Sequence, residues 1–239
     1  MKKKNLVFVV GNNFFSSKIL NNLKKSILDD KFNIIICFTQ NKHQLKETFI
    51  NMFLLNPINY LEIILYYLRF HKKKGNIRFV YDINEKKFIN YINSKKAFLI
   101  VSLMNSQIYK KKTLDKINSK IVNFHTGILP KYRGIYPNFY SMLHNEKKVG
   151  LTFHQINEKI DDGLIINQIF YNLDLNEKNL FELSKKIYLS YKTEKFFINS
   201  ILEYKKLFKK KSKELKKNKL TNNYYSYPKI AELIKFKFS

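Results

Sequence analysis

Short uninterrupted apolar runs, separated by segments with helical spacing, constrain the fold of this chain more than any other feature. Such runs are typical of strands buried on both faces of a parallel sheet. The runs that we interpret as strands are Asn5–Val10, Phe32–Phe38, Ile77–Val80, Ala97–Leu103 and Ile121–Phe124. Helical patterns lie between them, for example over Phe14–Leu28 and Asn84–Ile92. Strands that alternate with helices predict an α/β fold with an open, doubly wound, mostly parallel sheet.

The second half of the chain also divides into strands and helices. Gly150–Ile156 (GLTFHQI) alternates as a strand does, and the polar turn NEKIDDG leads to a further strand over Leu164–Phe170. The pattern is helical from Glu177 to about Lys217. With 239 residues, 45% of them hydrophobic, the chain can form one large domain or one domain with an appendage. We predict a main domain over residues 1–190 and a Lys-rich helical extension over 191–239, whose aromatic tail docks back on the main domain.

The formal net charge of +27 raises the question of a nucleic-acid partner. Only three of the 45 basic residues are Arg, whereas base and phosphate recognition usually favours the forked Arg side chain. We therefore expect weak, nonspecific affinity for polyanions, and the charge alone does not indicate a specific nucleic-acid role.

Cysteine usage, the first turn and the N-terminus exclude several classes of protein. The single Cys37 excludes an intrachain disulfide framework and a cysteine-based zinc site. The turn GNNFF after the first strand lacks the G-x-G-x-x-G fingerprint, which argues against a nicotinamide or flavin dinucleotide site. The N-terminus does not resemble a secretion signal, so we expect a cytoplasmic protein.

The most apolar segment covers residues 49–70 (FINMFLLNPINYLEIILYYLRF). Asn51, Asn56, Asn59 and Glu62 interrupt it, so we expect no transmembrane span. We interpret the segment as a core or lid helix that starts near Pro57. The alternative is a helix lying on a membrane or partner surface, helped by the basic residues that follow it.

The stretch NFHTGILPKYRG, from Asn123 to Gly134, concentrates residue types that are scarce in this chain. Asn123 and His125 come at the end of a predicted strand, where open α/β sheets place their active sites. Residues two apart in an extended segment point to the same side, so both side chains can converge on one bound molecule. Gly127, Pro130 and Gly134 then predict a shaped loop.

A carboxylate completes this pattern at Asp161, 38 residues after Asn123. At a neighbouring strand end it could hold the imidazole of His125 in one tautomer and stabilise its cation, which would tune the ring for proton transfer. The structural alternative is that Asp161-Asp162-Gly163 is only a turn, and that His125 is only a packed strand residue.

Together, N-F-H, the L-P-K-Y-R-G loop, GLTFH and D-D-G resemble the signature of the folate-dependent formyltransferase family, which has a Rossmann-like catalytic domain. The resemblance is strong over residues 97–172, moderate in the N-terminal sheet and weak beyond residue 190. It implies that Asn123, His125 and Asp161 are catalytic. It also implies an enzyme that transfers a formyl group from 10-formyltetrahydrofolate, its co-substrate, to an amine, with no metal.

Further site residues follow from the same resemblance. The folate-binding positions that it implies are Leu129, Pro130, Ile156, Asn157 and Glu158. The substrate-binding positions that it implies are Tyr132, Arg133, Gly134 and His154. It also implies a cis Leu129–Pro130 bond. Two alternatives stay open: His154 as a packed strand residue, and a triad shifted from Asp161 to Asp162.

The resemblance specifies the formyl donor better than the acceptor. After the last predicted catalytic strand, near residue 172, too little chain remains for a C-terminal tRNA-binding barrel of the usual size. We therefore expect a small amine acceptor, such as a nucleotide-linked amino sugar. The alternative is initiator methionyl-tRNA, held by diffuse positive charge and the Lys205–Lys219 run. A third interpretation is a noncatalytic RNA- or membrane-associated relative. The sequence does not specify an oligomeric state.

Overall fold

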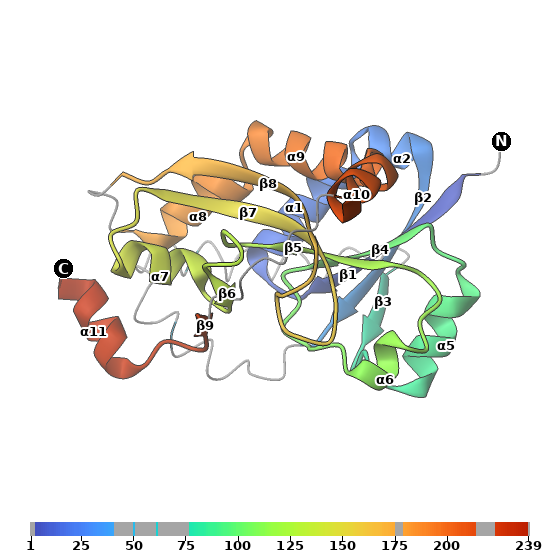
Figure 1. Ribbon diagram of the computed structural model, residues 1–239, viewed down its shortest axis with the longest axis horizontal. Coiled ribbons are helices and arrows are strands. Elements are labelled where there is room, and N and C mark those ends of the chain that lie inside the picture. Colours follow the sequence, from blue (N-terminus) through green and yellow to red (C-terminus); the bar gives the residue numbers. More distant parts are fainter. Residues whose placement is uncertain are drawn as a thin grey trace.

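Five of the predicted strands form the parallel part of a seven-stranded sheet in the computed structural model (Figure 1). The structure describes residues 3–40, 50, 61, 77–174, 179–213 and 223–238. The strands are β1 (Lys4–Gly11), β2 (Phe32–Thr39), β3 (Ile77–Val80), β4 (Leu99–Leu103), β5 (Ile121–His125), β7 (Lys148–Gln155) and β8 (Ile165–Asn172). Their order is β3-β2-β1-β4-β5-β7-β8. β7 runs antiparallel to β5, and β8 runs antiparallel to β7.

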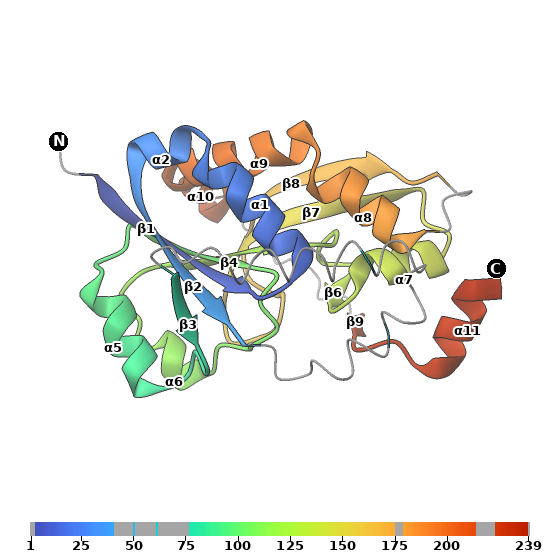
Figure 2. The ribbon, with the colours of Figure 1, turned by 180° about the vertical axis from the view of Figure 1, so that it is seen from behind.

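Helices cover both faces of this sheet (Figures 1 and 2). Within the described ranges the helices are α1 (Phe14–Lys24), α2 (Ile27–Lys31), α5 (Lys86–Ser94), α6 (Lys111–Leu114), α7 (Pro137–Leu143), α8 (Leu180–Tyr188), α9 (Tyr191–Leu202), α10 (Tyr204–Lys213) and α11 (Ile230–Phe238). On one side, α1, α8 and α9 pack on the sheet, and on the other side α5 does. The predicted α/β fold with a mostly parallel sheet is confirmed.

Strand β1 shows why its apolar run is uninterrupted. Leu6, Phe8 and Val10 belong to the hydrophobic cluster that includes α1 and α8. Val7 and Val9 belong to the cluster that includes α5 on the opposite face. All five side chains are completely buried. Because neither face of β1 meets solvent, both sets of alternating positions have to be apolar.

The helical pattern predicted over Phe14–Leu28 is wrong as a single helix. Helix α1 ends at Lys24, and α2 begins at Ile27 with Ser26 as its N-cap. The Ser26 hydroxyl accepts a hydrogen bond from the backbone N–H of Leu28, which satisfies one of the free N–H groups of the new helix. The described part of the stretch predicted to be helical, residues 179–213, contains three helices, and Asn179 and Ser190 cap α8 and α9.

Two interpretations concern residues that the structure describes only in part. The predicted core or lid helix over 49–70 lies outside the described residues, except for the buried Ile50 and the exposed Leu61. Helix α10 covers the described part of the Lys-rich run, and residues 214–219 of that run lie outside the described residues. Among the described residues, no helix is long and apolar enough to cross a membrane.

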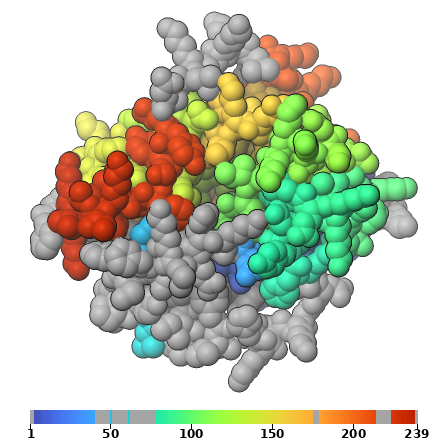
Figure 3. Space-filling model, turned by 90° about the horizontal axis from the view of Figure 1, so that it is seen from below, coloured from blue at the N-terminus to red at the C-terminus, as the bar shows by residue number. Residues whose placement is uncertain are grey.

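The C-terminal tail lies against the main body, as predicted (Figure 3). Its strand β9 (Tyr224–Tyr225) pairs in parallel with β6 (Arg133–Gly134), and its helix α11 packs on α7. The division into domains at residue 190 stays a prediction. Side chains before and after that position, such as Ile187 and Phe197, belong to the same hydrophobic cluster.

Candidate active site

Strand β5 brings Asn123 and His125 to the carboxyl edge of the parallel strands. Phe124, between them, is 1% exposed and packs in the core, so its two neighbours point to the other side. His125 is buried and Asn123 is half-buried. The predicted pair therefore shares one side of the strand, at the edge where β5 passes into the loop of residues 126–134.

The loop after β5 is packed tightly against the ring of His125. A Cβ atom on Gly127 would lie 2.6 Å from Cβ of Pro137 and 3.0 Å from Nε2 of His125, so a side chain does not fit there. The Leu129–Pro130 bond is cis, as the resemblance implied.

Thr152 of β7 is hydrogen-bonded to the backbone of this loop, a role that the sequence analysis missed. Its hydroxyl donates to the Gly127 carbonyl (2.7 Å) and accepts from the Leu129 N–H (3.1 Å). The side chain of Gln168 donates to the same hydroxyl and to the Leu129 carbonyl. Thr152 lies two residues before His154, so both side chains lie on the same face of the strand. That spacing was the sequence signal that could have placed Thr152 near the site.

Both ring nitrogens of His125 face polar groups of the protein. Nε2 lies 2.6 Å from the Tyr132 carbonyl oxygen, and because a carbonyl can only accept, Nε2 carries a proton in this arrangement. Nδ1 lies 3.5 Å from Oδ2 of Asp161. The carboxylate therefore faces the ring nitrogen that carries no proton when the ring is neutral.

Asp161 is fixed by the loop that carries Arg133 and Gly134. Its Oδ2 accepts a hydrogen bond from the Gly134 N–H (2.8 Å). The guanidinium of Arg133 donates twice to the carbonyl of Ile160, at 2.9 and 2.6 Å. Asp161 itself adopts a left-handed backbone conformation (φ 51°), which Asp tolerates better than most residues. These contacts place the Asp161 carboxylate, and not that of Asp162, beside His125.

His154 completes the cluster from β7, where it pairs in register with Asn123. Its Nε2 lies 3.2 Å from Nδ2 of Asn123 and 3.6 Å from Oδ1 of Asp161. Burial lowers the pKa of His154 to about 4; nearby His125 also lowers it, whereas Asp161 and the Gln155 carbonyl oppose the shift. The ring is therefore neutral at pH 7, and its approach to Asp161 is not an ion pair.

The structure brings together the side chains of Asn123, His125, His154 and Asp161, and the backbones of Tyr132 and Gly134 contact this cluster. The side chains of the other predicted site residues have different surroundings. Leu129 and Tyr132 are buried, and the Tyr132 hydroxyl donates to Glu146. Ile156 is half-buried and packs against the hydrophobic cluster on the α5 side. The side chain of Asn157 caps the backbone of its own turn.

Glu158, also predicted to bind folate, is an exposed residue. Its carboxylate forms an ion pair with Lys111 of α6. Whether Ile156, Asn157 and Glu158 border a folate therefore stays a prediction.

The tail adds a contact to the site that sequence reasoning did not assign. The ring of Tyr225 stacks on that of Tyr132, with centroids 5.4 Å apart. The Tyr225 carbonyl accepts a hydrogen bond from the Ile135 N–H (3.0 Å). Gly134 meets this strand with φ 98°, and a Cβ atom there would lie 2.0 Å from the Tyr225 oxygen. The aromatic residues of the tail predicted that it docks on the main domain, but they did not predict where.

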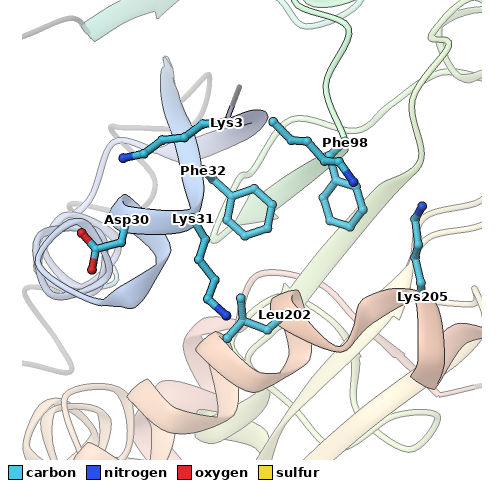
Figure 4. Close-up of a pocket in the computed structure, with 8 residues that line it drawn as sticks. Lys3, Asp30, Lys31, Phe32, Phe98, Leu202 and Lys205 are labelled. Carbon is cyan, nitrogen blue, oxygen red and sulfur yellow. The ribbon is translucent and has the colours of Figure 1, made fainter. Parts of the chain in front are cut away.

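A separate pocket of about 530 Å³ lies at the amino ends of β1 and β2 (Figure 4). It is lined by Lys3, Lys4, Asp30, Lys31, Phe32, Phe98, Leu202 and Lys205. None of these residues belongs to the cluster around His125, which sits at the carboxyl ends of the parallel strands. Among the described residues, no three His, Cys, Asp or Glu side chains gather in a group that could hold a metal ion.

Known proteins resemble this chain in sequence and in fold. Methionyl-tRNA formyltransferase of Finegoldia magna is 34% identical over 106 residues, which is 44% of this chain but only 34% of that enzyme. The chain thus spans about a third of that curated relative.

Among solved structures, the chain shares its fold with a sugar N-formyltransferase from Shewanella sp. FDAARGOS_354. The TM-score is 0.62 at 18% identity, and the match covers 97% of this chain and 86% of that one. It also shares its fold with an N-formyltransferase from Helicobacter canadensis in complex with folinic acid and dTDP-3-aminofucose. There the TM-score is 0.58 at 20% identity, with 99% and 79% covered.

The model of the formyl transferase family matches residues 3–188. This range contains Asn123, His125, His154 and Asp161 and all seven strands of the main sheet. The chain therefore belongs to the formyl transferase family.

Proposed function

We propose that the chain is an N-formyltransferase, which moves a formyl group from 10-formyltetrahydrofolate to the primary amine of a small acceptor. The observation that carries the proposal is the cluster in which Asp161 lies 3.5 Å from His125 while Asn123 contacts His154. Amide, imidazole and carboxylate at one strand edge are the groups that acyl transfer to an amine needs.

Each member of the cluster has a role in this chemistry. Attack of a neutral amine on the formyl carbon creates a tetrahedral species with a negative oxygen and a positive nitrogen. The Asn123 amide can donate a hydrogen bond to that oxygen, and this interaction strengthens as its charge develops. Because Nε2 of His125 is bonded to the Tyr132 carbonyl, Nδ1 is the nitrogen that can take the amine proton and pass it to the leaving nitrogen of the folate. The Asp161 carboxylate, which faces Nδ1, stabilises the cation that forms meanwhile.

For the acceptor we propose a nucleotide-linked amino sugar. The match to the Shewanella sugar N-formyltransferase covers 97% of this chain, so it includes most of residues 191–239. The Helicobacter canadensis enzyme, with a dTDP-amino sugar in its structure, is matched over 99% of the chain. Support for a small acceptor therefore comes from the fold of the C-terminal extension.

Initiator methionyl-tRNA is the second candidate, because the curated relative quoted above is a methionyl-tRNA formyltransferase. The similarity to that enzyme covers 44% of the chain, and it supports the shared transfer chemistry more than a shared acceptor. A noncatalytic relative is the third candidate, and the contact between His125 and Asp161 argues against it.

The reaction type is tested with the purified chain, 10-formyltetrahydrofolate and a panel of amines. We expect the His125→Ala variant to lose at least about 100-fold in kcat, because it removes the group that transfers the proton. His144→Ala removes an exposed histidine outside the cluster, whose Nδ1 lies 3.2 Å from the Tyr132 hydroxyl, and it should lower kcat by less than about 10-fold. Equal activity of His125→Ala and the unmodified chain would defeat the proposed mechanism.

The acceptor is tested by comparing amino-sugar nucleotides with initiator methionyl-tRNA in the same assay. We expect a higher kcat/KM for an amino-sugar nucleotide. Selective and faster formylation of the tRNA would overturn this assignment while leaving the reaction type intact.

A further inference from the structure

The hydrogen bonds of His154 specify which of its nitrogens carries the proton. Nδ1 lies 3.0 Å from the carbonyl oxygen of Gln155, which can only accept, so Nδ1 is protonated. In a neutral ring, Nε2 then carries no proton and is an acceptor. The group 3.2 Å from it is the amide nitrogen of Asn123, which can only donate. The two bonds are consistent only with the neutral Nδ1–H tautomer.

This contact determines how the Asn123 carboxamide is turned. Among the described residues, His154 is the single hydrogen-bond partner of that side chain. One amide hydrogen points to His154, which leaves the second hydrogen free to donate to another molecule. Without an acceptor at His154, the carboxamide could rotate and present its oxygen where a hydrogen was needed.

We propose that His154 is a positioning residue for formyl transfer: its unprotonated Nε2 fixes the Asn123 amide so that the free N–H faces the oxygen of the formyl group. The inference rests on the proposed function, in which Asn123 is the donor to that oxygen. His154 is 2% exposed, so it acts through Asn123 and offers little surface to a bound substrate. This role differs from the substrate contact that the sequence implied.

Burial of His154 keeps its Nε2 unprotonated and able to accept a hydrogen bond. A second proton on the ring would occupy Nε2 and turn that nitrogen into a hydrogen-bond donor. It would then face the Asp161 carboxylate, 3.6 Å away, and could no longer accept a hydrogen bond from the Asn123 amide. With a pKa of about 4, that proton is absent at neutral pH. The apolar surroundings of β7 therefore serve the chemistry as well as the packing.

The tautomer can be measured without any turnover. Long-range proton–nitrogen correlation spectra of the labelled chain at pH 7 should show His154 protonated at Nδ1 and unprotonated at Nε2. Its signals are identified by their loss in His154→Gln. A proton on Nε2 at pH 7 would overturn the inference, whatever the activity of the enzyme.

Two substitutions of His154 separate the effect of losing the hydrogen-bond acceptor at Nε2 from the effect of changing the side chain. Gln places an amide oxygen near the position of Nε2, whereas Asn ends near the position of Nδ1. We expect His154→Asn to lower kcat by about 10- to 100-fold with KM for 10-formyltetrahydrofolate changed less than about 3-fold, and His154→Gln to recover most of that loss. Val149→Ala, another buried position on β7, reports the effect of lost packing alone.

A double-substitution cycle tests whether His154 acts through Asn123. In the Asn123→Ala background, His154→Asn should change kcat by less than about 2-fold, because the group that it positions is gone. If the losses in kcat of the two single variants instead multiplied in the double variant, the inference would be overturned, but the proposed reaction would not. An unmodified chain that transfers formyl to no amine would instead defeat the proposed function. Thermal unfolding of each variant shows that the protein is folded.

Discussion

At the scale of single residues, the proposed mechanism depends most on the charge of the Asp161 carboxylate. It lies 3.5 Å from Nδ1 of His125 and 3.6 Å from Nε2 of His154. Substitution by Asn keeps the shape and an oxygen for the Gly134 N–H but removes the charge. We expect Asp161→Asn to lower kcat by about 10³-fold or more, since loss of the matching carboxylate in Ser-His-Asp enzymes costs about 10⁴-fold.

The neighbouring carboxylate provides the matched control for that prediction. Asp162→Asn removes the same charge one residue further from the cluster, and we expect nearly full activity. Formyl-transfer rates and unfolding midpoints of both variants check the difference. If Asp162→Asn lost more activity than Asp161→Asn, the assignment of the carboxylate would move by one residue.

The buried His154 also makes stability depend on pH. Its pKa is about 4 in the folded protein and near 6.5 in the unfolded chain, so the unfolded chain binds the extra proton between these values. Stability is therefore full above pH 6.5 and falls as the pH drops towards 4. From pH 7 to pH 5 we expect this residue to remove about 2 kcal/mol of unfolding free energy.

Urea titrations at several pH values measure this loss, and His154→Gln isolates it from other groups that titrate in the same range. The difference between the two proteins should shrink or reverse as the pH falls from 7 to 5. A constant difference would show that His154 is not buried as a neutral ring.

At the scale of elements, local patterns predicted the strands because their cause is local. The uninterrupted run of β1 and the alternation of β7 both follow from which faces are buried. Asn123, His125 and Asp161 could also be singled out, since strand ends and turn residues show their positions in the sequence. The break before α2 was missed because one capping residue, Ser26, outweighed a continuous helical pattern.

The pairing of β6 with β9 could not be predicted in the same way. Arg133 and Gly134 pair with Tyr224 and Tyr225, some 90 residues later, and neither two-residue strand has a pattern of its own. The contact between His154 and Asn123 is also long-range, as it depends on the register of β5 against β7. Register between distant strands is set by the assembled sheet, so a single sequence does not display it.

The tail strand leads to a prediction about the loop that holds Asp161. The ring of Tyr225 lies 5.4 Å from that of Tyr132 and 4.4 Å from that of Tyr140, measured between centroids. We expect Tyr225→Ala to destabilise the protein by about 1–3 kcal/mol, because the ring contacts that hold β9 in place are lost. We also expect a lower kcat, because β9 then pairs less firmly with β6. Unfolding curves, limited proteolysis of the tail and formyl-transfer rates measure these effects.

Tyr191 is the matched control for this substitution. Its ring is 69% exposed on α9, so Tyr191→Ala should change stability by no more than about 0.5 kcal/mol. Unchanged activity of Tyr225→Ala, together with rapid proteolysis of its tail, would show that the site does not depend on β9.

At the scale of the whole molecule, the net charge of +27 has to be separated from acceptor choice. Exposed lysines lie on several elements that contribute no residue to the cluster around His125. Examples are Lys24 on α1, Lys86 and Lys87 on α5, and Lys209 and Lys210 on α10. Charge spread in this way attracts any polyanion through counterion release and carries no preference for one RNA over another.

The salt dependence of RNA binding therefore distinguishes the two acceptors. Between 50 and 200 mM salt, we expect the affinities for initiator tRNA and for an unrelated RNA of equal length to fall together, by about 100-fold or more. The kcat/KM for an amino-sugar nucleotide should change less than about 10-fold, because a small ligand displaces few counterions. Fluorescence titrations and rate measurements in the same buffers make the comparison direct. A preference for initiator tRNA that persisted at 200 mM salt would require specific contacts, and it would favour methionyl-tRNA as the acceptor.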